Sequence, residues 1–183
     1  MNTLSGILFF VAFLPYIITI VGGQTIPSPL SWAIWASVDT LALVAMMKKK
    51  VAVGQLIGAV SGAWIVTVLA ILYGKPEMRL MEWIAIAGAV VGIALWKIYG
   101  DSIFGIVCSQ IAVFVGAFPT FMGAYANPKQ EDALSWCIWT ASCFCALFAV
   151  KKWTVADALQ PVTFATIETV MVLLVVVRPM MFA

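Results

Sequence analysis

Histidine is absent from this chain, and charged side chains are scarce. Only 10% of the 183 residues are Asp, Glu, Lys or Arg, whereas 64% are hydrophobic. A soluble globular domain carries about 25% charged residues, so this chain has too few to cover a surface that faces water. The lack of histidine removes the commonest metal ligand and the residue most often used for proton transfer near neutral pH. The composition therefore predicts a polytopic membrane protein surrounded by the lipid bilayer.

Cysteine is also infrequent, and no two cysteines form a CxxC pair. The four are Cys108, Cys137, Cys143 and Cys145. We interpret them as small packing residues in preference to a metal or redox site. The sequence shows no nucleophile beside a base and no phosphate-binding glycine loop, so we expect neither an enzyme nor a bound cofactor or metal. A net charge of +2 gives no reason to expect a nucleic-acid partner.

Long apolar stretches occupy most of the chain. A helix needs about 20 apolar residues to cross a bilayer. Seven stretches meet this need approximately, at 3–22, 31–47, 51–73, 81–98, 102–125, 133–150 and 155–177. Each run is continuous, whereas transmembrane strands would alternate in polarity. We therefore predict an all-α fold of seven transmembrane helices. No Lys or Arg precedes the first stretch, so we expect it to be retained and not cleaved as a signal peptide.

One six-residue pattern occurs twice. The sequence LSWAIW at 30–35 returns as LSWCIW at 134–139, which is 104 positions later. Tryptophan is rare enough that two coincident pairs indicate an internal duplication. The predicted units are a three-helix repeat at 1–73, a connector with one helix at 74–101, and a second three-helix repeat at 102–183. One intervening helix gives both repeats the same orientation, so we expect a 3-1-3 arrangement of parallel repeats about an axis along the membrane normal.

Proline and glycine occur at positions that affect helix shape and packing. Pro15 and Pro119 are separated by the same 104 positions and lie inside predicted helices, where proline favours a kink. Membrane helices tolerate such prolines, but the matched placement favours a second interpretation, a pair of hinges. Gly54, Gly58 and Gly62 are spaced by four, which predicts close approach of another helix.

The tryptophan pairs mark one face of each second helix. Trp32 and Trp35, like Trp136 and Trp139, are three residues apart and therefore share a helix face. Asp39 is four residues beyond Trp35 and extends that face. Even on the lenient insertion scale an uncompensated carboxylate at mid-span costs about 2.5–3.5 kcal/mol, so it should face the protein interior. We therefore expect these five residues to line a substrate site.

Glu168 is the second acid at mid-span. Gln160, Phe164 and Glu168 are spaced by four and share a stripe, on which Gln160 and Glu168 are candidate substrate-binding residues. No Lys or Arg lies at comparable depth, so neither Asp39 nor Glu168 has a cationic partner. Two interpretations stay open for these acids: a role in substrate binding or proton coupling, and interhelical hydrogen bonding of a neutral carboxyl. The other carboxylates lie at span ends, where we expect them to be solvated: Glu77, Glu82, Asp101, Glu131, Asp132 and Asp157.

These features resemble the PQ-loop superfamily, which includes SWEET-type sugar transporters, lysosomal amino-acid transporters and the KDEL receptor. The likeness consists of a first-helix proline, a short polar loop at 22–29, and a Ser-Trp pair that opens the second helix. The 3-1-3 layout is similar too, so the resemblance spans essentially the whole chain. The glutamine expected after the proline is Tyr16 here, and Thr120 in the second repeat. The chain is more similar to small uncharacterised bacterial membrane proteins with Pro-Thr-Phe, as at 119–121, followed by proline and an acid.

Function follows as an expectation. We expect a transporter of a sugar, amino acid or similar small polar metabolite, working by alternating access between the two bundles, with the unpaired acids suggesting proton coupling. The rival is a non-transporting scaffold, receptor or accessory subunit in which the tryptophans are packing or interface residues. Either a homo-oligomer or a complex with another membrane subunit is consistent with the sequence.

Lysine and arginine are distributed unevenly between the loops. Six lie on the N-terminal side and four on the other. The positive-inside rule therefore favours a cytoplasmic N-terminus, although PQ-loop proteins usually place it outside. We expect location in the bacterial inner (plasma) membrane.

Overall fold

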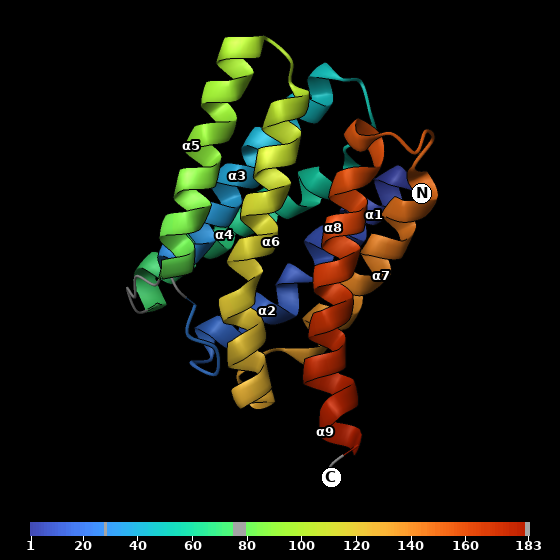
Figure 1. The fold of residues 1–183 in the computed structure, drawn as a ribbon. Coiled ribbons are helices and arrows are strands. Elements are labelled where there is room, and N and C mark those ends of the chain that lie inside the picture. The colour runs from blue at the N-terminus through green and yellow to red at the C-terminus, as the bar shows by residue number, and fades with distance from the viewer. Residues whose placement is uncertain (28, 75–79, 182–183) are drawn as a thin grey trace.

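The computed structural model describes residues 1–27, 29–74 and 80–181, and these parts are helical, without strands (Figure 1). The elements are α1 (Asn2–Val11), α2 (Phe13–Val21), α3 (Pro29–Lys48), α4 (Gly54–Tyr73), α5 (Leu80–Tyr99), α6 (Ile103–Ala126), the 3₁₀ turn η1 (Pro128–Gln130), α7 (Ala133–Ala149), α8 (Val155–Val172), the π-helical turn η2 (Leu173–Val177) and α9 (Arg178–Met181). Because α1 continues almost directly into α2, and α8 into η2 and α9, the chain forms seven helices. The predicted all-α class is confirmed.

Four helices are long and apolar enough to cross a membrane. They are Asn2–Val21, Gly54–Tyr73, Ile103–Ala126 and Val155–Met181. The helix at Ala133–Ala149 is apolar but shorter, at 17 residues. These spans were found among the described residues by length and composition, and they are compatible with an integral membrane protein.

The helices run alternately between two ends of the bundle. We name the end with loops 49–53, 100–102 and 150–154 the N-terminal end, and the end with loops 22–27 and 127–132 the C-terminal end (Figure 1). The Gly54 N–H donates to Asn2 Oδ1 at 2.6 Å, which joins the starts of α1 and α4 at the N-terminal end. Arg178 donates to the Tyr125 carbonyl at 2.5 Å, which joins the last turns of α6 and the C-terminal helix at the other.

Six of the seven helices surround a common interior. α4 packs against both α1 and α3, and α8 packs against both α7 and α6. Two further contacts, α1 with α7 and α3 with α6, close the ring. α5 packs against α6 and α3 from outside this ring (Figure 1). The interior is therefore bounded by every helix except α5.

The first helix is interrupted one turn before Pro15. α1 ends at Val11 and α2 begins at Phe13, with Ala12 as a turn residue. Pro15 has no N–H to donate to the Val11 carbonyl, and its ring crowds that carbonyl. α6, in contrast, continues without interruption through position 119. The Pro119 side chain lies outside the described residues, and the hinge role of both prolines stays a prediction.

Glycines bring α1 and α4 into backbone contact. A Cβ atom added at Gly58 would meet the Gly6 carbonyl, and one at Gly54 would meet the Asn2 carbonyl. The approach predicted from the glycine spacing in α4 is therefore confirmed, and its partner is α1.

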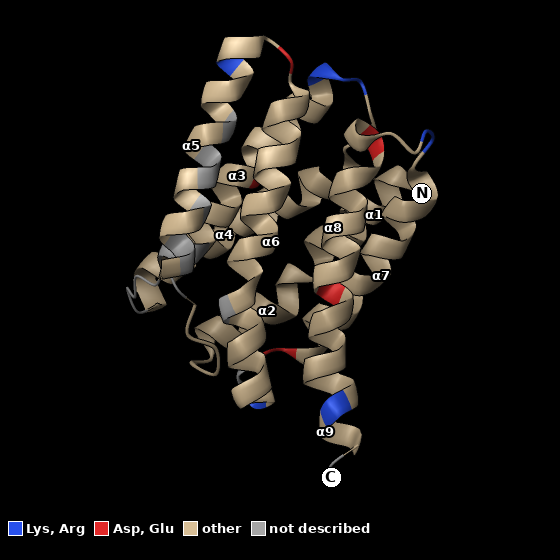
Figure 2. Ribbon diagram, in the orientation of Figure 1, with Lys and Arg blue, Asp and Glu red and all other residues tan. Residues whose placement is uncertain are grey.

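Charged side chains lie mainly at the two ends, with lysines concentrated at the N-terminal end (Figure 2). There Lys49 Nζ lies 2.6 Å from Asp101 Oδ1, and this contact holds the pKa of the Asp101 carboxyl below its ordinary value. The expected solvation of Asp157 is wrong. It is only 5% exposed, because its Oδ2 accepts the backbone N–H groups of Lys151 and Lys152 in the loop folded over it.

Candidate functional site

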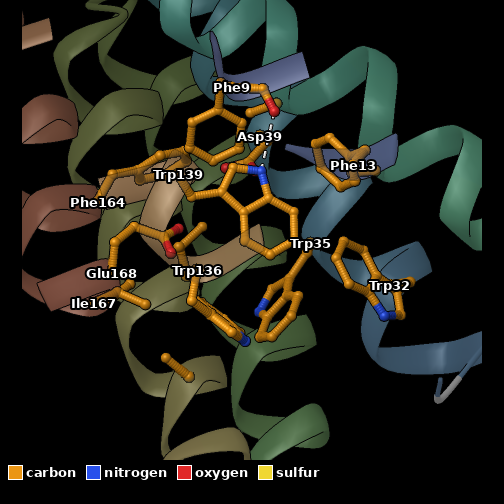
Figure 3. Close-up of a pocket in the computed structure, with 14 residues that line it drawn as sticks. Phe9, Phe13, Trp32, Trp35, Asp39, Trp136, Trp139, Phe164, Ile167 and Glu168 are labelled. Atoms are coloured by element: carbon orange, nitrogen blue, oxygen red, sulfur yellow. Dashed lines mark hydrogen bonds between the residues drawn. The ribbon is translucent and has the colours of Figure 1, made fainter. Parts of the chain in front are cut away.

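A cavity lies among the six helices that surround the interior (Figure 3). Its empty volume is about 550 Å³, the open mouth included. The lining residues come from α1, α2, α3, α4, α6, α7 and α8, and α5 contributes none that the structure describes. They are Phe9, Phe13, Trp32, Trp35, Asp39, Ala59, Ala63, Val113, Ala117, Trp136, Trp139, Phe164, Ile167 and Glu168.

Six of the seven predicted binding residues line this cavity, and Gln160 does not. Gln160 Nε2 instead donates to Gln55 Oε1 at 3.0 Å, nearer the N-terminal end. Gln55 Nε2 in turn donates to Cys143 Sγ at 3.1 Å. These three side chains form a buried polar cluster beside the cavity. Pro15 is not among the lining residues that the structure describes.

Trp139 lies at the centre of the cavity wall. Its side chain is 2% exposed, and its indole N–H donates to the Phe9 carbonyl at 3.0 Å (Figure 3). Its ring centroid lies 5.0 Å from that of Phe13 and 5.1 Å from that of Trp136. Such edge-to-face contacts stabilise the cluster beyond the burial of apolar area. Trp139 therefore holds α7 against the first helix.

The other tryptophan pair is the more exposed of the two. Trp32 and Trp35 are partly exposed, whereas Trp136 and Trp139 are buried. Trp35 packs over Gly116 of α6, where an added Cβ would lie 2.6 Å from the indole nitrogen. Glycine at that position therefore makes room for the Trp35 ring between α3 and α6.

Two carboxyl groups enter the cavity wall, one from α3 and one from α8. Asp39 is 6% exposed and Glu168 is 7% exposed. Asp39 Oδ1 and Glu168 Oε2 are buried without a hydrogen-bond partner among the described residues. A buried polar atom left unsatisfied costs about 1–3 kcal/mol, and the lining residues that the structure describes include no Lys or Arg to offset it. The cavity thus presents two acceptors that its own walls do not satisfy.

Sequence reasoning missed several residues at the site. Phe9 and Phe13 line the cavity, and Gln110 is buried one turn from the lining residue Val113. Both polar atoms of the Gln110 amide lack a partner among the described residues. Its position in the middle of an apolar helix was a signal that pointed to a polar interior. The phenylalanines gave no such signal, because lipid-facing helix surfaces use the same residue types.

Glu131 is not the freely solvated acid that its place in a loop suggests. Its Oε2 accepts the indole N–H of Trp136 at 3.0 Å. Burial raises the pKa of the Glu131 carboxyl to about 7, against the opposing effect of that hydrogen bond. The neighbouring Asp132 instead caps α7, where its Oδ1 accepts the Ser135 N–H at 2.7 Å. Glu131 therefore fixes one tryptophan of the cavity from the C-terminal end.

Most lining residues fall into pairs at the repeat offset. Ten of the fourteen form five pairs separated by 104 positions: Phe9 and Val113, Phe13 and Ala117, Trp32 and Trp136, Trp35 and Trp139, and Ala63 and Ile167. The residues without a paired counterpart in the lining are Asp39, Ala59, Phe164 and Glu168. Positions separated by the predicted repeat offset thus supply most of the wall, and the two acids are not part of these pairs.

In the described part of the chain, no three His, Cys, Asp or Glu side chains gather as a metal site. No family model, curated protein or solved structure matches this chain. Likeness to known proteins therefore supplies neither a family nor an activity, and the cavity is the feature from which function follows.

Proposed function

We propose that this chain is a small-molecule transporter that works by alternating access between two three-helix bundles. The first bundle consists of α1 to α4, the second of α6 to α9, and α5 connects them; all seven helices cross the membrane. One observation carries the proposal. The walls of one cavity come from both proposed bundles, largely from positions 104 residues apart, and include two carboxyl oxygens without a partner among the described residues.

The helix packing supports parallel repeats. A twofold axis along the membrane normal would exchange α1 with α6, α3 with α7, and α4 with α8. Under that exchange, the packing of α4 on α1 and α3 becomes the packing of α8 on α6 and α7. The contact of α1 with α7 becomes that of α6 with α3. Each of these contacts is present, and the five lining pairs at the 104-residue offset agree with the same axis.

The hydrogen bonds between the bundles favour a state closed toward the N-terminal end. Ser142 Oγ donates to the Ser5 carbonyl at 2.7 Å, which ties α7 to the first turn and a half of α1. The contacts among Gln55, Gln160 and Cys143 tie α4 to α7 and α8 at a similar depth. The partly exposed Trp32 and Trp35 lie toward the other end. Alternating access would require these bonds to break as the bundles rock.

Uptake by reconstituted protein tests this proposal. Proteoliposomes and protein-free liposomes would be supplied with a panel of labelled sugars, amino acids, nucleosides and organic amines. We expect protein-dependent uptake of at least one class, lost in both Asp39→Asn and Glu168→Gln. If no class enters above the protein-free control, the transporter proposal fails.

A cysteine lock tests alternating access separately. The hydroxyl oxygens of Ser5 and Ser142 lie 3.3 Å apart, so cysteines at both positions should crosslink. The four native cysteines would first be replaced. Oxidation of the double variant should stop uptake and reduction should restore it, whereas each single variant should be insensitive to both treatments. Uptake that continues through the locked protein would contradict a rocking mechanism.

The dense aromatic packing favours a second function, that of a rigid scaffold, receptor or accessory subunit. Ring centroids of Trp139 and its neighbours lie 5.0–6.0 Å apart, so the cavity walls support one another without a ligand. A scaffold should purify with a stoichiometric membrane partner and gain no thermal stability from any compound in the panel. A transporter should be stabilised by its substrate without a partner.

A further inference from the structure

The chemistry of the cavity wall distinguishes among classes of ligand. Half of the fourteen lining residues are aromatic: Phe9, Phe13, Trp32, Trp35, Trp136, Trp139 and Phe164. The face of an aromatic ring carries partial negative charge and attracts a cation within about 6 Å of its centroid. Among the aromatic side chains, the Trp ring attracts a cation most strongly. The aromatic rings alone therefore favour a positively charged ligand, without any contribution from the two acids.

The two acids add to this preference from opposite bundles. Asp39 belongs to α3 and Glu168 to α8, and Figure 3 shows both carboxyls among the tryptophan and phenylalanine rings. Each is more than nine-tenths buried and has an oxygen without a partner among the described residues. No lysine or arginine is among the described residues that line the cavity. A cationic ligand would supply the positive charge that the described lining residues lack.

The same wall is poorly suited to sugars and amino acids. A sugar needs many hydrogen-bond partners, and the indole N–H groups of Trp136 and Trp139 are already donated to Glu131 and to the Phe9 carbonyl. An amino acid carries a carboxylate, which needs a cation or several N–H donors when it is buried. The described lining residues include no Lys or Arg, and two of their four indole N–H groups are already donated within the protein.

We infer that the cavity binds a small organic cation, an amine or quaternary ammonium compound, held over the tryptophan rings and between Asp39 and Glu168. This inference rests on the proposed transport function and names its substrate class. The ligand would carry its charge on a compact head with an apolar surface, because the remaining walls are alanine, valine and isoleucine.

Two cations and their neutral carbon isosteres provide the test. The cations are choline and phenyltrimethylammonium; in each isostere a tert-butyl group replaces the trimethylammonium group, so shape is kept and charge is lost. Binding to the full-length protein in detergent would be followed by tryptophan fluorescence and by calorimetry. We expect at least one cation to bind about tenfold or more tightly than its isostere, a difference typical of a desolvated cation–aromatic contact.

Variants locate the binding site. Asp39→Asn and Glu168→Gln should each weaken cation binding about tenfold or more without changing the affinity for the isostere. Asp101→Asn removes a surface acid at the N-terminal end and is the matched control, with binding unchanged. Retained thermal stability of each variant shows that it is folded, and Glu168→Asp serves as a second variant if the amide form does not fold.

The outcomes separate the two proposals. Equal binding of cation and isostere, or no binding of either cation, overturns the cation inference. If a sugar or amino acid is then transported through the same acids, the transport proposal stands without it. If a cation binds but no compound enters proteoliposomes, the transport proposal fails and the cavity is a receptor site for cations.

Discussion

A single methyl group added at Gly58 tests the packing on which the first bundle depends. Gly58 lies in α4 at the place where its backbone meets that of α1, and a Cβ there would overlap the Gly6 carbonyl. Neither backbone can move independently, because each is part of a continuous helix. Gly123 in α6 is the matched control: it is also helical, and a Cβ there has nothing within 4 Å.

The two substitutions to alanine should have opposite effects. Alanine favours the helix over glycine by about 1 kcal/mol at either position. At Gly123 this gain stands alone, and for a chain of this size it should raise the melting temperature by about 2–4 °C. At Gly58 the overlap with backbone should cost about 3 kcal/mol, the upper part of the range for overpacking. The net loss of about 2 kcal/mol lowers the melting temperature by about 4–8 °C.

Thermal stability of the purified variants in one detergent measures both shifts. The fraction that stays monodisperse on size-exclusion chromatography would be followed after heating, with intrinsic tryptophan fluorescence as a second probe. Gly58→Leu should be worse than Gly58→Ala, because the larger side chain cannot be accommodated by small shifts. A Gly58→Ala protein as stable as Gly123→Ala would refute the assigned contact between α1 and α4.

Three further outcomes follow from the site and the loops. Because the Glu131 pKa is raised from 4.5 to about 7, the folded protein holds this proton more tightly than the unfolded chain. Its contribution to the free energy of unfolding, at most about 3 kcal/mol, is therefore present below pH 4.5 and is lost as pH rises through about 7. In the Glu131→Gln variant, the melting temperature should change less over this pH range. Trp139→Phe keeps an aromatic side chain but removes the indole N–H that the Phe9 carbonyl accepts, together with part of the buried ring volume. It should lower the free energy of unfolding by at least about 1–3 kcal/mol in denaturant titrations. Asp101→Asn breaks an ion pair whose side chains are 34% and 46% exposed, and the melting temperature should not change measurably.

The helices could be predicted because membrane-length apolar runs leave little choice of structure. The stretch 81–98 appears as Leu80–Tyr99, and 133–150 as Ala133–Ala149. The tryptophan pairs were predicted to share a face, and both pairs line one cavity. Helix periodicity fixes which side chains lie together on one helix, so this part of the site follows from spacing alone.

The remaining site depends on contacts between helices, which spacing does not determine. Gln160 and Glu168 share a stripe, but eight residues separate them by about 12 Å along the helix axis. Gln160 therefore meets Gln55 of α4, while Glu168 reaches the cavity. Glu131 is a loop residue by sequence, and only the packing of the loop against α7 buries it.

The two acids differ from the walls in how they relate to the proposed duplication. The position 104 residues after Asp39 is Cys143, whose Sγ accepts a hydrogen bond from Gln55 Nε2. The position 104 residues before Glu168 is Trp64, which is 44% exposed and donates its indole N–H to Thr40 Oγ1. Neither Cys143 nor Trp64 is among the described lining residues, so each proposed repeat contributes one acid to the cavity. If the bundles rock as proposed, the paired walls would keep their geometry, but the separation between Asp39 and Glu168 would change. The hold on a cation between them would therefore differ between the two access states, which is the condition for release.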